Sequence, residues 1–69
     1  MLGPHTQLLK TIILSELAKL DPETKRSTMQ AIAQLPRHAD DTLQLRCDRL
    51  LELLARLVPE THARIERLR

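Results

Sequence analysis

Two short segments of this chain have nearly the same sequence, and each carries a proline at the same place. Residues 17–24 read LAKLDPET and residues 54–61 read LARLVPET, with six of the eight positions identical. A residue that precedes proline is driven out of the α region, whereas proline itself suits the first position of a helix. Each segment is therefore expected to contain a helix end, a sharp corner and a helix start. Internal duplication and convergence both account for the similarity.

Apolar residues recur at helical spacing along the chain, which predicts an all-α fold of three to four helices arranged as two helix-proline-helix hairpins. A first helix is expected over about 4–20 and a second over about 22–35, with Asp21 as the N-cap of the second. The third is expected to end at about Leu57, and a short last helix to begin at Pro59. Whether the Pro59 corner separates two helices or kinks one stays open.

Each expected helix has an apolar face that we assign to the core of a single domain spanning the chain. The second helix has the thinnest such face. Lys10, Glu16 and Lys19 are assigned to the polar side of the first helix. The assigned core residues are Leu9, Ile13, Leu17 and Leu20, broadened by Leu8 and Ile12, in the first helix; Met29, Ile32, Ala33 and Leu35 in the second; and Ile65 and Leu68 in the last.

Two alternatives stay open for the start of the third helix. Asp40 or Asp41 is suited to cap it, and Asp41 with Gln44 has the spacing of a capping box. The alternative is that Pro36 begins the helix directly.

The third helix is the most apolar segment of the chain. Between residues 43 and 57, apolar residues repeat at alternating spacings of four and three, as they do in paired helices. Further leucines lie beyond this seam, and a helix that is apolar nearly all round is buried on more than one side. We therefore expect a homodimer packed along this helix. The expected interface residues are Leu43, Cys47, Leu50, Leu53, Leu54 and Leu57.

Composition excludes several classes of function. The single glycine is too few for a phosphate-binding glycine loop, and the three histidines do not have the spacing of a metal site. His38 beside Asp40 and Asp41 is interpreted as an ordinary helix entry. Cys47, the only cysteine, is interpreted as a buried small hydrophobe. We predict no catalytic, cofactor-binding or metal-binding residues, and hence a protein that is not an enzyme.

Basic residues near the expected corners are candidates for contacts with a partner. A net charge of +2 permits nucleic-acid binding without requiring it, and the absence of Phe, Tyr and Trp leaves no ring to stack on bases. We therefore expect the partner to be another protein. The candidate residues are Lys25, Arg26, Met29, Arg37, Arg46, Arg49, Arg64 and Arg67. The alternatives are a small DNA-binding transcriptional regulator that uses the second helix or the C-terminal arginines, and a structural oligomerisation adaptor.

In size, all-helical character and lack of catalytic chemistry, the whole chain resembles small phage-encoded proteins that bind and disable host regulators, such as the anti-activators of quorum-sensing transcription factors. No residue motif carries the resemblance, so no binding residues are transferred from that group. The resemblance implies a homodimer that masks a host transcription activator. No stretch reaches the ~18 apolar residues of a membrane span, and one free cysteine fits a reducing compartment. We expect a cytoplasmic protein.

Overall fold

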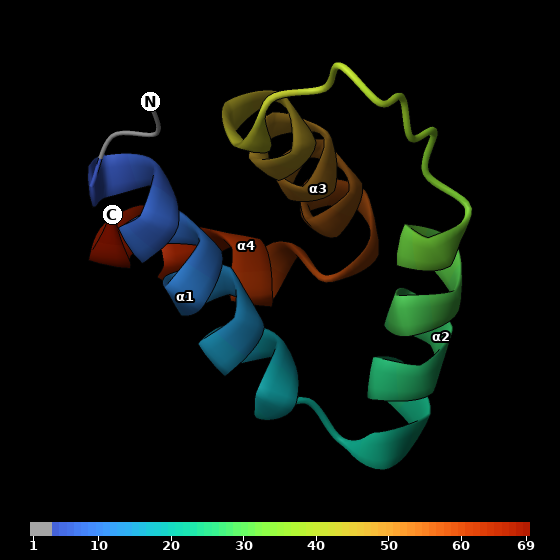
Figure 1. The fold of residues 1–69 in the computed structure, drawn as a ribbon. Helices are drawn as coiled ribbons and strands as arrows, with labels where there is room; N and C mark the ends of the chain where they lie inside the picture. The colour runs from blue at the N-terminus through green and yellow to red at the C-terminus, as the bar shows by residue number, and fades with distance from the viewer. Residues whose placement is uncertain (1–3) are drawn as a thin grey trace.

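The computed structural model describes residues 4–69, and within this range the chain forms four helices and no strand. These are α1 (Pro4–Ala18), α2 (Pro22–Ala33), α3 (Leu43–Leu57) and α4 (Pro59–Leu68). In Figure 1, α1, α3 and α4 lie together, whereas α2 stands on the far side of α3 and is joined to it by a long connection. The all-α prediction is confirmed, although α1 and α2 end slightly earlier than expected.

Both prolines of the repeated segments stand in the first turn of a helix. Pro22 begins α2, and Asp21 caps it as predicted, because the Asp21 carboxylate accepts a hydrogen bond from the N–H of Thr24 at 3.1 Å. Pro59 begins α4 directly after Val58, whose φ of −136° and ψ of 69° are not helical. This non-helical residue makes α3 and α4 two separate helices.

The start of α3 differs from both of the expected starts. Thr42 is its N-cap, and the Thr42 hydroxyl accepts a hydrogen bond from the N–H of Leu45 at 3.1 Å. Threonine caps a helix by the same bond that an aspartate makes. Pro36 lies within the connection that precedes α3, so neither Pro36 nor Asp41 begins the helix.

Asp41 instead ties the connection between α2 and α3 to the body of α3. Its carboxylate accepts a hydrogen bond from the N–H of His38 at 3.0 Å and forms an ion pair with Arg49. Burial raises the pKa of Asp41, but the hydrogen bonds from Arg49 and His38 outweigh this effect and lower the pKa overall. The carboxylate therefore stays charged and holds the connection beside α3.

The core lies where α1, α3 and α4 meet, and it contains no aromatic side chain. Ile13, Leu54 and Ile65 are its most deeply buried members. Full burial of one aliphatic side chain contributes about 1.5–3 kcal/mol, so several such side chains replace what aromatic residues supply elsewhere. The buried cluster consists of Leu9, Ile13, Leu17, Cys47, Leu51, Leu54 and Ile65.

Some residues that helical spacing assigned to the core are exposed, and some polar residues are buried. Leu8 and Leu68 are both more than half exposed, because α1 and α4 turn only narrow faces toward α3. Glu16, which was assigned to the polar side of its helix, is buried between α1 and α4. On α2 the buried residue is Thr28, while Met29 is exposed.

Helix α2 has the thinnest contact with the rest of the protein. Its main packing partner is α3, whereas α1, α3 and α4 all pack on one another. Ile32 is partly buried against the core, and Ala33 is exposed. Figure 1 shows α1 and α2 diverging from their shared corner, with α3 beyond them.

Replacement of Leu54 by alanine tests the position of the core. Leu54→Ala is expected to lower the free energy of unfolding by about 2–5 kcal/mol, because it removes a fully buried side chain and leaves a cavity. Urea unfolding followed by circular dichroism measures the change. Leu68→Ala is the control, since it removes the same atoms from an exposed side chain and is expected to cost less than about 0.5 kcal/mol. Equal losses of unfolding free energy in the two variants would contradict the placement of Leu54 in the core.

Candidate partner-binding groove

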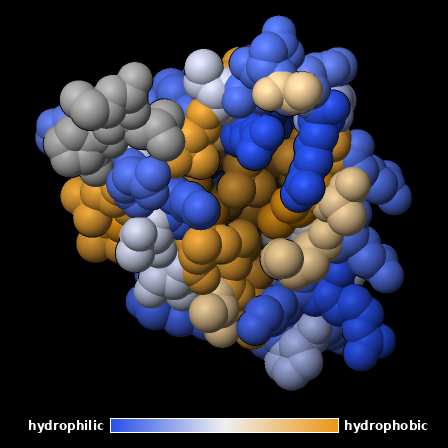
Figure 2. All heavy atoms as spheres, viewed as in Figure 1, coloured by the Kyte–Doolittle hydropathy of each residue, from blue (hydrophilic) through white to orange (hydrophobic). Residues whose placement is uncertain are grey.

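A hollow lined by α1, α2 and α3 opens in the face shown in Figure 2. Two cavities form it, one of about 240 Å³ between α1 and α3 and one of about 190 Å³ between α2 and α3. The two cavities share Arg37, Arg46 and Leu50, so they are parts of one depression, which we call the central groove. Its other lining residues are Lys10, Ile13, Leu14, Ile32, Leu35, Pro36, Leu43, Cys47 and Arg49.

The floor of the central groove is apolar. Leu14 of α1 is 53% exposed, and Leu50 of α3 and Ile32 of α2 are partly exposed. Figure 2 shows this apolar area in the middle of the face, with hydrophilic side chains along its upper edge. Exposed apolar patches with polar rims mark interaction sites. The groove is therefore a candidate site for apolar side chains of a partner.

Three cations at the rim of the groove have no acidic partner. Lys10, Arg37 and Arg46 form no ion pair with any residue in 4–69, and no Asp or Glu of that range lines either cavity. Arg49 differs from them, because Asp41 neutralises it. The groove therefore has a positive charge that the described part of the chain does not compensate, and a cleft of one sign attracts ligands of the opposite sign.

The predicted partner-binding residues lie in three separate places. Arg37, Arg46 and Arg49 meet at the central groove. Arg64 and Arg67 line a separate shallow hollow between α1 and α4. The remaining three are exposed on α2 and line neither hollow: Lys25, Arg26 and Met29.

Lys10 and Leu14 of α1 are among the groove residues that were not predicted to bind a partner. The sequence places Lys10 on the polar side of the first helix and Leu14 away from its core face. They are four positions apart, and residues at this spacing are neighbours on a helix surface. An exposed leucine one turn from a lysine, on a face that the core does not use, is the signal that would have identified them.

The residues predicted for a dimer interface are divided by the fold. Cys47, Leu53 and Leu54 are buried inside a single chain, and Cys47 and Leu54 belong to the cluster where α1, α3 and α4 meet. In this fold they offer no surface to a second copy. The homodimer along α3 stays a prediction, and it would have to use the members of the set that retain exposed surface. These are Leu43, Leu50 and Leu57.

Cys47 lies at the inner end of the groove and is 3% exposed. Burial raises the pKa of its thiol, which disfavours the reactive thiolate. The prediction of a buried cysteine that acts as a small hydrophobe is confirmed.

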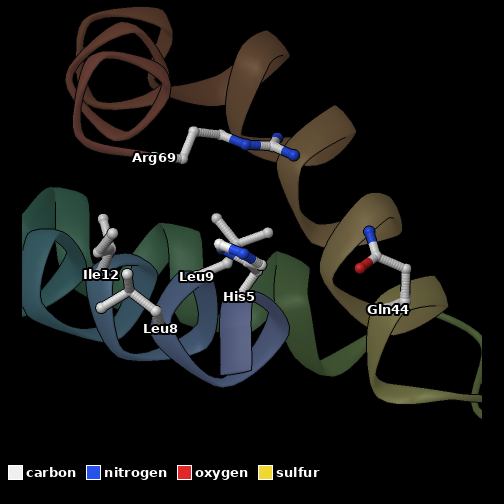
Figure 3. A pocket seen from close by; sticks show the side chains of 6 residues that line it. All are labelled: His5, Leu8, Leu9, Ile12, Gln44 and Arg69. Atoms are coloured by element: carbon white, nitrogen blue, oxygen red, sulfur yellow. The ribbon is translucent and has the colours of Figure 1, made fainter. Parts of the chain in front are cut away.

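Another hollow, of about 270 Å³, lies at the N-terminal end of α1 (Figure 3). In Figure 3, Arg69 reaches over His5, with Gln44 on one side and the leucines of α1 on the other. Two of its polar side chains are already engaged, since Gln44 accepts a hydrogen bond from Thr6 at 3.0 Å and Arg69 pairs with Glu66 at 3.3 Å. It therefore offers a partner less uncompensated charge than the central groove. It is lined by His5, Leu8, Leu9, Ile12, Gln44 and Arg69.

Glu16 is an anion held between two cations on the side of α1 that faces α4. The Glu16 carboxylate accepts hydrogen bonds from Lys19 Nζ at 2.7 Å and Arg64 Nε at 2.9 Å. These two bonds lower the pKa of Glu16, although burial acts in the opposite direction. The cluster joins α4 to α1 and neutralises Arg64, so this predicted partner-binding residue already has an acidic partner within the chain.

Two kinds of feature are missing from the part of the chain that the structure describes. None of the helices in residues 4–69 is long and apolar enough to cross a bilayer. The same residues place no three His, Cys, Asp or Glu side chains where they would hold a metal ion.

Comparison of the sequence with protein-family models and with curated proteins, and of the structure with solved structures, gives no match. The geometry of the central groove is therefore the main indication of function.

The lowered pKa of Glu16 predicts a loss of stability in acid. A carboxyl whose pKa is lower in the folded state stabilises the fold above its unfolded pKa, about 4.3 for glutamate, and loses that effect as pH falls through the folded value. Glu16→Gln is therefore expected to unfold more easily near neutral pH and to lose less further stability on acidification. Thermal unfolding across the acid range measures both effects.

Glu52→Gln is the matched control for this experiment, because Glu52 is exposed and forms no ion pair among residues 4–69. It is expected to leave both the neutral stability and the acid dependence unchanged. A Glu16→Gln protein with the same acid dependence as the parent would show that the cluster does not contribute.

Proposed function

We propose that this chain is a small, non-enzymatic protein-binding module that takes a segment of another protein into the central groove. One observation carries the proposal: the apolar floor between α1 and α2 remains exposed in the folded chain, and the cations Lys10, Arg37 and Arg46 border it without acidic partners among residues 4–69. Apolar surface at the centre with charged groups at the rim is the usual anatomy of a protein interface.

DNA binding is the second candidate, because the same cations would attract phosphates. The apolar floor favours a protein, since Leu14, Leu50 and Ile32 make no favourable contact with phosphate and offer no polar group to a base edge. Phosphate contacts make binding fall steeply with salt, whereas burial of leucines does not. Salt dependence therefore separates the two candidates.

The narrower roles stay predictions. Inhibition of a host transcription activator follows only from the resemblance to phage anti-activators. A homodimer and an oligomerisation adaptor both require a second copy on the exposed part of α3, and either is compatible with a partner in the groove.

Two leucines of α1 provide a matched test of the groove. Leu14, 53% exposed, lies in the groove, and Leu8, 55% exposed, lies outside it on the same helix. Leu14→Asp is expected to abolish capture of a partner protein from cell lysate, because it puts a charge on the apolar floor. Leu8→Asp is expected to capture it as well as the parent does. Quantitative mass spectrometry of the bound proteins, with circular dichroism to confirm folding, measures the difference.

Nuclease treatment and a wash at about 0.5 M salt, where the Debye length is only a few ångströms, complete this test. The partner protein is expected to stay bound through both steps. Loss of the bound protein after nuclease treatment would favour DNA binding, and loss in Leu8→Asp but not in Leu14→Asp would move the site to the hollow beside His5.

A further inference from the structure

We infer that the segment bound in the central groove is an acidic amphipathic helix of another protein. The inference rests on the proposed function, because it specifies the chemistry of what occupies the same groove. It follows from three features of the groove: its position among the helices, the division of its floor into two cavities, and the positive charge of its rim.

The groove is lined by residues of three helices. Residues of α1 and α3 line one cavity, and residues of α2, the following connection and α3 line the other, so an occupant of both cavities contacts three helices. Helix-in-groove binding uses this kind of surface, whereas the addition of a β-strand needs an exposed sheet edge. No strand exists among residues 4–69 to provide such an edge.

The floor of the groove is divided into two sites for apolar side chains. Leu14 lines the cavity between α1 and α3, Ile32 lines the cavity between α2 and α3, and Leu50 is common to both. Each cavity can take one large apolar side chain, and a helix presents such side chains as neighbours on one face at positions i and i+3 or i+4. The amphipathic character of the partner follows from this division.

The rim determines the charge of the partner. Arg37 and Arg46 border both cavities and Lys10 borders one, and none of them has an acidic partner among the described residues. Asp or Glu beside the apolar anchors of a bound helix would pair with these cations. A helix with Lys or Arg at the same positions would meet like charge, which interfaces use to reject wrong partners.

A library of displayed helical peptides tests this inference. Each peptide has about 20 residues, a length of about 30 Å as a helix, with leucines fixed at i, i+3, i+4 and i+7 and all flanking positions randomised. The library is selected on the full chain and counter-selected on Leu14→Asp. The expected result is enrichment of Asp and Glu at positions that flank the leucines.

Binding of one enriched peptide then locates the charge effect. Fluorescence anisotropy is expected to give a Kd about tenfold weaker for Arg46→Glu than for the parent. Arg56→Glu is the control, because Arg56 is an exposed arginine on the same helix that lines neither cavity. Replacement of the peptide's acidic residues by lysine is expected to restore binding to Arg46→Glu.

Several results would overturn the inference, and they are distinguishable. Enriched peptides with neutral or basic flanks would refute an acidic partner and leave the groove as a protein-binding site. If no peptide is enriched on the parent chain relative to the Leu14→Asp variant, both the inference and the proposed function are refuted. A dimer in light scattering that Leu14→Asp dissociates would make the occupant a second copy of this chain. Duplex DNA that binds the parent and Leu14→Asp equally, but not Arg46→Glu, would replace the protein partner by nucleic acid.

Discussion

The burial of α3 by α1 and α4 is the interaction on which the rest of the structure depends. Leu54 lies at its centre with Ile13 and Ile65, so one aliphatic cluster joins three helices. A chain of 69 residues without aromatic side chains has little apolar surface to distribute. Because α1, α3 and α4 use most of it on each other, little is left to hold α2 in the same core.

The position of α2 explains the groove. Only a narrow face of α2 rests on α3, and Asp41 ties the connection that follows it to Arg49. This arrangement holds Arg37 beside Arg46 on the open side of α3. The cationic rim and the exposed floor are thus consequences of how the core is formed, and they arise from residues far apart in the sequence.

Features with a local cause could be predicted from the sequence. Both proline corners, the Asp21 cap and the inward face of α1 depend on residues within one or two turns of each other. Thr28 and Glu16 were missed because their burial depends on which helices pack against them, and helical spacing does not contain that information. The third helix shows the same limit. Apolar residues around most of its circumference indicated burial against several helices, but not that α1 and α4 of the same chain provide that burial.

The candidate site was predictable only in part, for the same reason. The sequence identified Arg37, Arg46 and Arg49, which lie near the start of the third helix, but not Lys10 and Leu14, which the fold brings to them from α1. Nor did it separate these arginines from Arg64, whose charge Glu16 neutralises. A site shared by three helices depends on tertiary packing that no single segment encodes.

Methyl NMR of the isotope-labelled chain, titrated with an acidic amphipathic helical peptide, tests the central claim most directly. The account predicts that the methyl signals of Leu14, Ile32 and Leu50 shift together, because these side chains line one groove from three helices. The signals of Leu8 and Leu68 are predicted to stay in place. Shifts confined to Leu8 and Leu68, with the groove residues unchanged, would contradict the assignment of the central groove as the binding surface.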